Sequence, residues 1–162
     1  MPDLLSTPGC VGLSLLVDHA TSWCIATSSW QDQAAMRASA DAVRSVRDRF
    51  VAEIGGTPPI VDEWEIALMH RDHHAMEGAR ARASWLQGNS SSIGDSIESV
   101  RAILPLLEDL PGFCSASLLV NREAGRAVST VIYDSADALA QTRARANDLR
   151  TYVADQLSLI HI

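Results

Sequence analysis

The chain repeats part of its own sequence after 103 residues, and this internal repeat constrains the fold more than any other feature. The longest matching run is Ser14–Val17, which recurs as Ser117–Val120. The hydrophobic pattern around this run also recurs, without any insertion. We infer that the chain contains two copies of one structural unit. Nine residues within 8–53 have an identical counterpart 103 positions later: Pro8, Gly9, Ser14, Leu15, Leu16, Val17, Thr27, Ala35 and Arg47.

Each copy is expected to begin with a β-hairpin. A Pro-Gly turn precedes two short, mostly apolar runs, and turn-forming residues separate these runs. This pattern is typical of two antiparallel strands. The strands are predicted at 11–18 and 23–30 in the first copy, and at 114–121 and 126–133 in the second.

An amphipathic helix is expected after each hairpin. Asp32 and Ser135 occupy equivalent positions where a helix N-cap is needed. Apolar residues then recur at helical spacing, with Arg and Gln on the other positions. These apolar residues are Met36, Ala40, Val43, Val46 and Phe50 in the first copy, and Leu139, Ala146, Leu149 and Val153 in the second.

The segments that occur only once complete the predicted topology. Residues 60–70 alternate acidic and apolar side chains, as a strand with one wet face does. Residues 79–87 are strand-like, and 95–110 have helical spacing despite Pro105, which should kink that helix. The combined order is βαββαβ, the α+β ferredoxin-like arrangement.

This order predicts how the chain divides into domains. Residues 1–70 form a partial ferredoxin-like copy (ββαβ), and 71–78 form a polar linker. Residues 79–162 form a second copy (βαββα) whose last strand is missing or replaced. The first copy lacks its N-terminal half, because only seven residues precede Pro8.

Composition and charge exclude several classes of function. The 162 residues carry a net charge of −7, with 20 acidic and 13 basic side chains, which disfavours nucleic-acid binding. The longest uncharged apolar run, Cys10–Val17, is far shorter than the roughly 20 residues of a membrane span. Three irregularly spaced cysteines (Cys10, Cys24 and Cys114) suit a reducing compartment. We therefore expect a cytoplasmic protein.

Two stretches of the chain resemble the antibiotic biosynthesis monooxygenase family. One is 110–126 (LPGFCSASLLVNREAGR), followed by a strand that ends in Tyr133-Asp134-Ser135. The other runs from Pro8-Gly9 to Trp30-Gln31-Asp32 and continues at 62–66 (DEWEI). The resemblance extends over 8–70 and 79–156, and its individual motifs are short.

The resemblance implies a fold and a range of activities. It implies ferredoxin-like units whose sheets meet in an α/β barrel, here formed between the two tandem copies of one chain or in a homodimer. Some family members oxidise polyphenol-like substrates with O2 and with neither metal nor flavin, others degrade haem, and many have no known activity. The expected ligand is a small aromatic or polyketide-like molecule.

Four aromatic residues are candidates for binding such a ligand, while the catalytic residues stay unassigned. Trp30 and Tyr133 are equivalent in the repeat and end corresponding strands, whereas Trp64 and Trp85 lie on predicted strands. Packing against neighbouring elements is the favoured explanation for all four. Two hypotheses therefore stay open: a cofactor-independent monooxygenase, and a non-catalytic binding or structural protein.

No metal or cofactor site is predicted. His70, His73 and His74 lie within a polar stretch that has no matching ligand set in the other copy. Haem degradation is disfavoured, because the Trp and His positions of haem-degrading relatives hold Ala38 and Asp48 here in the first copy, and Gln141 and Thr151 in the second.

The last six residues have two interpretations. Residues 157–162 (LSLIHI) read as a plausible strand, but they also translate CTG TCT CTT ATA CAC ATC, the end sequence of a transposase adapter used in sequencing libraries. The second interpretation predicts that the chain is a fragment of a longer tandem protein.

Overall fold

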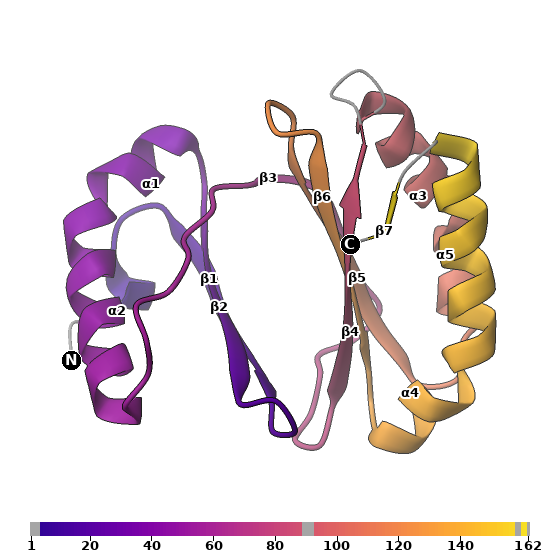
Figure 1. Ribbon diagram of the computed structural model, residues 1–162, viewed down its shortest axis with the longest axis horizontal. Coiled ribbons are helices and arrows are strands. Elements are labelled where there is room, and N and C mark those ends of the chain that lie inside the picture. The colour runs from indigo at the N-terminus through magenta and orange to yellow at the C-terminus, as the bar shows by residue number, and fades with distance from the viewer. Residues whose placement is uncertain (1–3, 89–92, 158–159, 162) are drawn as a thin grey trace. The chain divides into compact units, whose positions relative to one another are not determined.

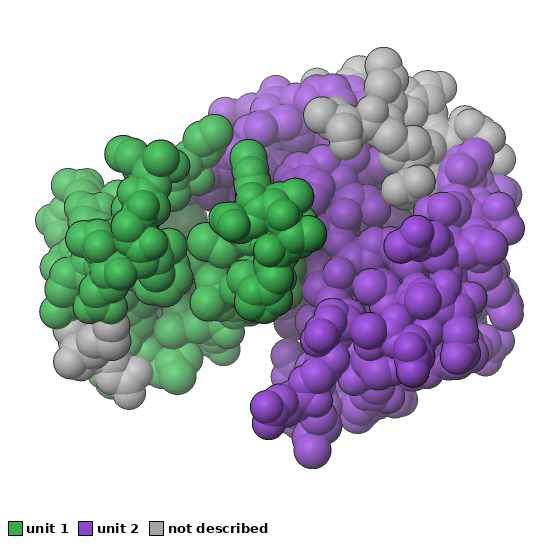
Figure 2. Space-filling model, turned by 60° about the horizontal axis from the view of Figure 1, so that its bottom comes forward, with its two compact units in different colours: residues 1–61 green, residues 62–162 purple. Residues whose placement is uncertain are grey.

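A computed structural model describes residues 4–88, 93–157 and 160–161. The chain divides into two compact units, Met1–Val61 (unit 1) and Asp62–Ile162 (unit 2), which are coloured separately in Figure 2. The boundary falls within the predicted strand 60–70, whose paired part, Glu65–Arg71, belongs to the sheet of unit 2.

Unit 1 is a β-hairpin with two helices (Figure 1). The strands β1 (Cys10–Asp18) and β2 (Trp23–Trp30) pair antiparallel, as predicted. The predicted single helix is divided at Ser39 into α1 (Gln33–Ala38) and α2 (Ala40–Ile54). The Asp32 carboxylate accepts the Ala35 amide at 2.8 Å, which confirms the predicted N-cap. A short 3-10 turn, η1 (Leu4–Ser6), precedes β1.

Unit 2 contains a five-stranded sheet of order β3-β5-β6-β4-β7. Helices α3 and α5 lie on one face of this sheet (Figure 1). The order β5-β6-β4-β7 is that of a βαββαβ unit, with the short β7 in the place of its closing strand. The elements are β3 (Glu65–Arg71), β4 (Arg80–Gln87), α3 (Ile93–Glu108), β5 (Phe113–Asn121), β6 (Arg126–Tyr133), α4 (Ala136–Gln141), α5 (Arg143–Leu157) and β7 (Ile160–His161).

The last strand of the first copy and the C-terminal segment compare with the structure as follows in residue bounds. The strand predicted from residue 60 begins only at Glu65, because its partner β5 ends at Asn121 and offers no ladder to earlier residues. Within the C-terminal segment, Ile160–His161 pairs with β4, while residues 158, 159 and 162 lie outside the described residues.

The hairpins of the two units match at the offset of 103 residues. Cys10 pairs with Trp30 and Phe113 pairs with Tyr133, and each ladder has a bulge directly after the first pair. The turns also match, since the Gly9 carbonyl accepts an amide hydrogen bond at 2.8 Å and so does the Gly112 carbonyl. Ser135 caps α4 as Asp32 caps α1.

Equivalent strand residues nevertheless differ in burial. In unit 2, α3 packs on β5, and the helix-facing residues of β5 are at most 5% exposed. In unit 1 the equivalent residues are 45–63% exposed. In the repeat, the short turn η1 corresponds to the C-terminal end of α3, and the described part of unit 1 has no longer helix there to cover these residues. The pairs are Val11 and Cys114, Leu13 and Ala116, Leu15 and Leu118, and Val17 and Val120.

The core of unit 2 therefore fills the space between the sheet and its helices. Leu118 and Tyr133 are fully buried there, against Val100, Ile103 and Leu107 of α3. No helix among the described residues of unit 2 covers the opposite face of the sheet, which is called the open face below. No helix within the described ranges is both long and apolar enough to cross a membrane.

Candidate functional site

The open face of unit 2 carries a row of apolar side chains across four strands. The ladder registers align Ile66 of β3 with Leu119, Leu119 with Val128, and Val128 with Trp85 of β4. Directly paired residues project on the same face of a sheet, so these four side chains form one row. Trp85 is 41% exposed and Ile66 is 39% exposed, whereas Val128 is only 8% exposed, so the row is accessible to a ligand at its two outer strands.

Polar groups border this row on both sides. The next level along the strands aligns Met69, Ser117, Thr130 and Ala83, so that two hydroxyl groups lie beside the apolar row. On the other side, the Arg126 guanidinium lies 5.3 Å from the centre of the Trp64 ring and 2.9 Å from an Asp62 carboxylate oxygen. Two of the predicted candidates, Trp64 and Trp85, thus lie at this surface, one at its edge and one within it.

The other two predicted candidates lie on helix-facing strand positions. Tyr133 is fully buried in the core, where the Arg82 guanidinium lies 5.6 Å from its ring centre. Arg82 also donates to the Leu139 carbonyl at 2.9 Å, which ties β4 to α4. Trp30 is half-buried and its indole nitrogen donates to the Ser28 hydroxyl at 3.1 Å. Both aromatic rings lie at a strand end, and their part in ligand binding stays a prediction.

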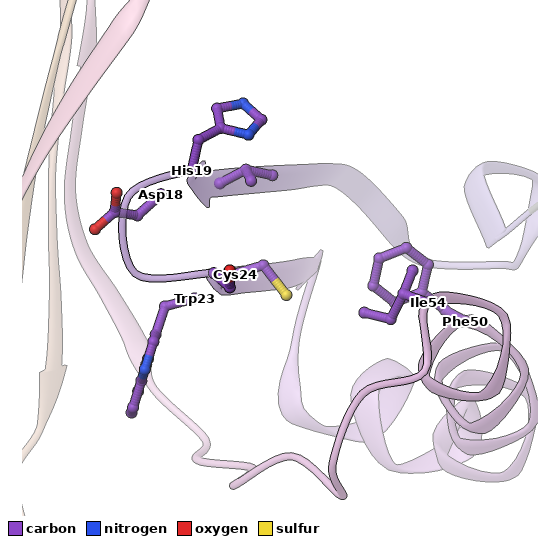
Figure 3. Close-up of a pocket in the computed structure, with 8 residues that line it drawn as sticks. Asp18, His19, Trp23, Cys24, Phe50 and Ile54 are labelled. Carbon is purple, nitrogen blue, oxygen red and sulfur yellow. The ribbon is translucent and has the colours of Figure 1, made fainter.

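Unit 1 contains a separate shallow pocket at the turn of its hairpin (Figure 3). The Cys24 side chain points toward Phe50 and Ile54 of α2, while Trp23 and His19 point away from that helix. In unit 2 the equivalent strand packs against α3, whereas no helix among the described residues of unit 1 takes that place, and this leaves the pocket open to solvent.

A second cluster lies at the other end of the unit 2 sheet, where β3 ends and β5 begins. Asp134 accepts two hydrogen bonds on the same carboxylate oxygen, one from His73 Nε2 at 2.8 Å and one from Cys114 Sγ at 3.1 Å. The Asp72 carboxylate lies 2.7 Å from His73 Nδ1, the other ring nitrogen. The reactive atoms of His73, Cys114 and Asp134 all lie within 4.8 Å of one another.

Hydrogen bonds and burial shift the pKa values of the three side chains in this cluster. Hydrogen bonds to Asp72 and Asp134 raise the pKa of His73 above its usual value. The hydrogen bond from His73 lowers the pKa of Asp134, and that from Cys114 lowers it further. Burial raises the pKa of the Cys114 thiol to about 12, and the Asp134 carboxylate adds to this shift. Cys114 is therefore a protonated thiol at neutral pH and not a nucleophile.

The two histidines near His73 have other surroundings. His70 lies on β3, 2.6 Å from the Glu108 carboxylate, and stacks on Phe113 at a ring-centre distance of 6.1 Å. His74 is exposed. The three histidines therefore do not converge on one point, and only His73 joins the cluster.

Comparison with known proteins identifies the relatives of the chain. It is 49% identical over 151 residues to the uncharacterized protein Rv2557 of Mycobacterium tuberculosis H37Rv, a match that covers 93% of this chain and 67% of Rv2557. The chain belongs to the Rv2557 family. A second relative, the uncharacterized protein Rv2558 of the same strain, is 50% identical over 153 residues, which are 93% of this chain and 64% of Rv2558. The chain thus spans about two thirds of the length of these relatives.

Solved structures of other proteins share the fold of the chain. A "putative monooxygenase" of Lactobacillus acidophilus superimposes with a TM-score of 0.67 at 12% identity, covering 94% of this chain and 73% of that one. A "putative monooxygenase" of Fusobacterium nucleatum gives 0.67 at 12%, covering 95% and 73%. A ferredoxin-fold protein of Listeria monocytogenes, described as related to antibiotic biosynthesis monooxygenases, gives 0.53 at 8%, covering 91% and 72%. The fold is therefore α+β and ferredoxin-like. No known protein-family model matches the chain.

No local sequence pattern indicates the cluster at His73, because its other members, Cys114 and Asp134, lie 41 and 61 positions further along the chain. The same is true of the row on the open face. The alternation in 60–70 and the strand-like pattern of 79–87 indicated the two outer strands, but the register that aligns Ile66 with Trp85 depends on bulges and pairings that no local pattern encodes.

Proposed function

We propose that the protein is an antibiotic biosynthesis monooxygenase-like domain protein that binds a small aromatic or polyketide-like molecule on the open face of unit 2 and oxidises it with O2, without a cofactor. The observation that carries this proposal is the row from Ile66 to Trp85, bordered by hydroxyl groups on one side and by Arg126 on the other. The row spans three strand spacings, about 14 Å, which is long enough for a molecule of fused rings.

The residues of the open face have distinct roles in this proposal. The apolar row, with the Trp85 ring, holds the flat face of the ligand and excludes water from it. The Ser117 and Thr130 hydroxyls bind polar ring substituents, and the Arg126 guanidinium stabilises a phenolate or enolate oxygen as it gains charge. In such a reaction a ring CH2 group becomes a ketone: one oxygen atom of O2 enters the product and the other leaves as water with both hydrogens. No further reductant is required.

A specific observation favours binding without turnover as the second candidate. Within the described residues of β3 to β6, the register places no aspartate, glutamate or histidine side chain on the open face. Proton abstraction from the ligand would therefore need a group outside this face, such as Asp62, which Arg126 already holds. A non-catalytic ligand-binding or structural role would need no such group.

The proposal includes the tandem organisation and its setting. The matching registers and turn hydrogen bonds of the two hairpins support two copies of one ferredoxin-like unit, whose sheets pair in a barrel within the chain or in a homodimer. The net charge of −7 supports a small-molecule partner rather than nucleic acid. The unpaired cysteines Cys10, Cys24 and Cys114 support a cytoplasmic location.

The test uses anthrone, a fused-ring substrate with one ring CH2 group, and measures both O2 uptake and ligand binding. We expect anthraquinone and water to form, with one O2 consumed for each anthrone. Trp85→Ala should weaken binding by about tenfold, the loss expected for one aromatic contact of about 1.4 kcal/mol. Trp23→Ala is the matched control, because Trp23 is exposed on unit 1 and lies outside the row.

The outcomes separate the two candidates. Turnover that Trp85→Ala reduces and Trp23→Ala leaves unchanged supports the oxygenase. Binding of anthraquinone to the wild-type protein without O2 uptake from anthrone supports the non-catalytic binder. Equal effects of the two substitutions, or binding to neither compound, would refute a ligand site on the open face.

A further inference from the structure

We propose that His73, Cys114 and Asp134 form a binding site for one zinc ion. The three residues come from three different segments, directly after β3, near the start of β5, and directly after β6. They supply an imidazole nitrogen, a sulfur and a carboxylate oxygen within 4.8 Å of one another. This is a mixed ligand set of the kind that binds zinc, and it differs from an ordinary surface cluster of acidic residues.

The spacing of the ligand atoms fits a tetrahedral ion. Zinc bond lengths of roughly 2.0–2.3 Å place neighbouring tetrahedral ligand atoms about 3.3–3.7 Å apart. Here Asp134 Oδ1 lies 2.8 Å from His73 Nε2 and 3.1 Å from Cys114 Sγ, and the widest separation within the set is at most 4.8 Å. Side-chain shifts of about an ångström or less would bring all three atoms to their zinc distances.

Asp72 gives His73 the orientation that a metal ligand needs. Its carboxylate lies 2.7 Å from His73 Nδ1, so Nδ1 keeps its proton and Nε2 is directed at Asp134 and Cys114. A carboxylate on the far nitrogen of a ligating histidine is the common second layer of zinc sites, where it fixes the ring and increases its basicity.

The backbone holds the three ligands in fixed positions. The Cys114 carbonyl accepts the amides of Asp72 and His73, at 2.9 and 3.3 Å. The Asp134 amide donates to the Gly112 carbonyl at 2.8 Å, two residues before Cys114. The ligand-bearing segments are therefore hydrogen-bonded directly to one another, and the site is organised before an ion arrives.

Access and protonation are compatible with binding. The His73 and Asp134 side chains are 41% and 46% exposed, so an ion can enter from solvent, while Cys114 forms the buried floor. The ion would replace the protons on Cys114 Sγ and His73 Nε2, which leave to solvent. Three protein ligands leave the fourth tetrahedral position for water or another small ligand.

The site is independent of the proposed function and occurs once in the described chain. It lies at the end of the sheet opposite Trp64 and Arg126, about seven residues along β5, which corresponds to roughly 23 Å. The equivalents of Cys114 and Asp134 in unit 1 are Val11 and Gln31, which cannot complete the set. We therefore expect one ion per chain.

Cobalt(II) is the spectroscopic probe that tests the site. The purified protein, stripped with a chelator, is titrated with Co2+, and a near-ultraviolet thiolate-to-cobalt charge-transfer band reports a bond to sulfur. We expect one Co2+ per chain, displaced by an equal amount of Zn2+, and a melting temperature that rises with added Zn2+. Cys114→Ser should abolish the band, and Asp134→Asn or Asp72→Asn should weaken zinc binding by about 10–100-fold.

Control variants keep the test decisive. Cys24→Ser and His74→Gln replace exposed residues outside the cluster and should leave the band and the affinity unchanged. Asp134 is half-exposed, so Asp134→Asn tests the site even if Cys114→Ser fails to fold. The proposal is overturned if no charge-transfer band appears, if the band survives in folded Cys114→Ser, or if Cys24→Ser removes it.

Discussion

Replacing Gly112 by alanine tests the close approach between the Pro-Gly turn and the helix that follows each hairpin. Gly112 has a φ of +70°, a conformation that residues with a β-carbon rarely adopt. A β-carbon built there would lie 2.7 Å from the β-carbon of Ala138 in α4, whereas ordinary contacts lie at 3.4–4 Å. The substitution therefore combines an unfavourable backbone conformation with a steric overlap.

The magnitude follows from these two contributions. The positive φ costs about 1 kcal/mol for alanine, and overpacking a tight contact costs about 1–3 kcal/mol more, so Gly112→Ala should lower the free energy of unfolding by about 2–4 kcal/mol. Gly78→Ala is the matched control in the same unit, because Gly78 has a φ of +92° but no atom within 4 Å of the built β-carbon. It should cost only about 1 kcal/mol.

Urea unfolding followed by far-ultraviolet circular dichroism measures both effects. We expect the unfolding midpoint of Gly112→Ala to fall by two to four times as much as that of Gly78→Ala, with similar slopes. Equal shifts in the two variants would show that the turn and α4 do not approach as described, and would refute the reasoning.

Three further predictions concern unit-specific packing, acid sensitivity and helix capping. Leu118→Ala should lower the free energy of unfolding by about 2–5 kcal/mol, because Leu118 is fully buried. Leu15→Ala, at the equivalent position but 50% exposed, should lower it by less than about 1.5 kcal/mol. Equal costs in urea unfolding would contradict the difference in helix coverage between the two units. The hydrogen bond from Arg122 lowers the pKa of Glu65 below its ordinary 4.5, so the pair stabilises the fold above that pH and loses its contribution as the pH falls through the lowered value. Because both side chains are half-exposed, Glu65→Gln should cost at most about 1 kcal/mol of unfolding free energy at pH 7 and nothing in acid. A cost that persists unchanged in acid would argue against an ionic contribution. Ser135→Ala should cost about 1 kcal/mol and Ser135→Asp almost nothing, as measured by thermal melting, and a harmless alanine would mean that the hydroxyl does not cap α4.

Much of the local structure could be predicted from the sequence. The repeat and its turn residues predicted both hairpins, and Asp32 and Ser135 predicted both helix starts, because these features depend on residues close together in the chain. The alternation in 60–70 predicted a strand but not its partner, which is β5 of unit 2. Pairing partners depend on long-range contacts, which a single sequence does not encode in any local pattern.

The candidate site was predicted only in part for the same reason. The sequence predicts Trp85 and Tyr133 alike as aromatic residues on strands. The structure has Trp85 on the open face and Tyr133 in the core. The difference depends on which strand face the helices cover, and therefore on the register of four strands. The sequence groups His73 with its neighbours His70 and His74, whereas in the structure it lies beside Asp72, Cys114 and Asp134, two of which lie at the ends of other strands.

Methyl-resolved NMR of the protein with and without anthraquinone tests the central claim most directly. The Met69 and Ile66 methyl groups lie on the open face, and those of Leu118 and Leu86 lie on the helix-facing side. The account predicts that the ligand shifts the Met69 and Ile66 signals and leaves those of Leu118 and Leu86 in place. Shifts confined to Leu118 and Leu86, or no shift at saturating ligand, would contradict a binding site on the open face of the sheet.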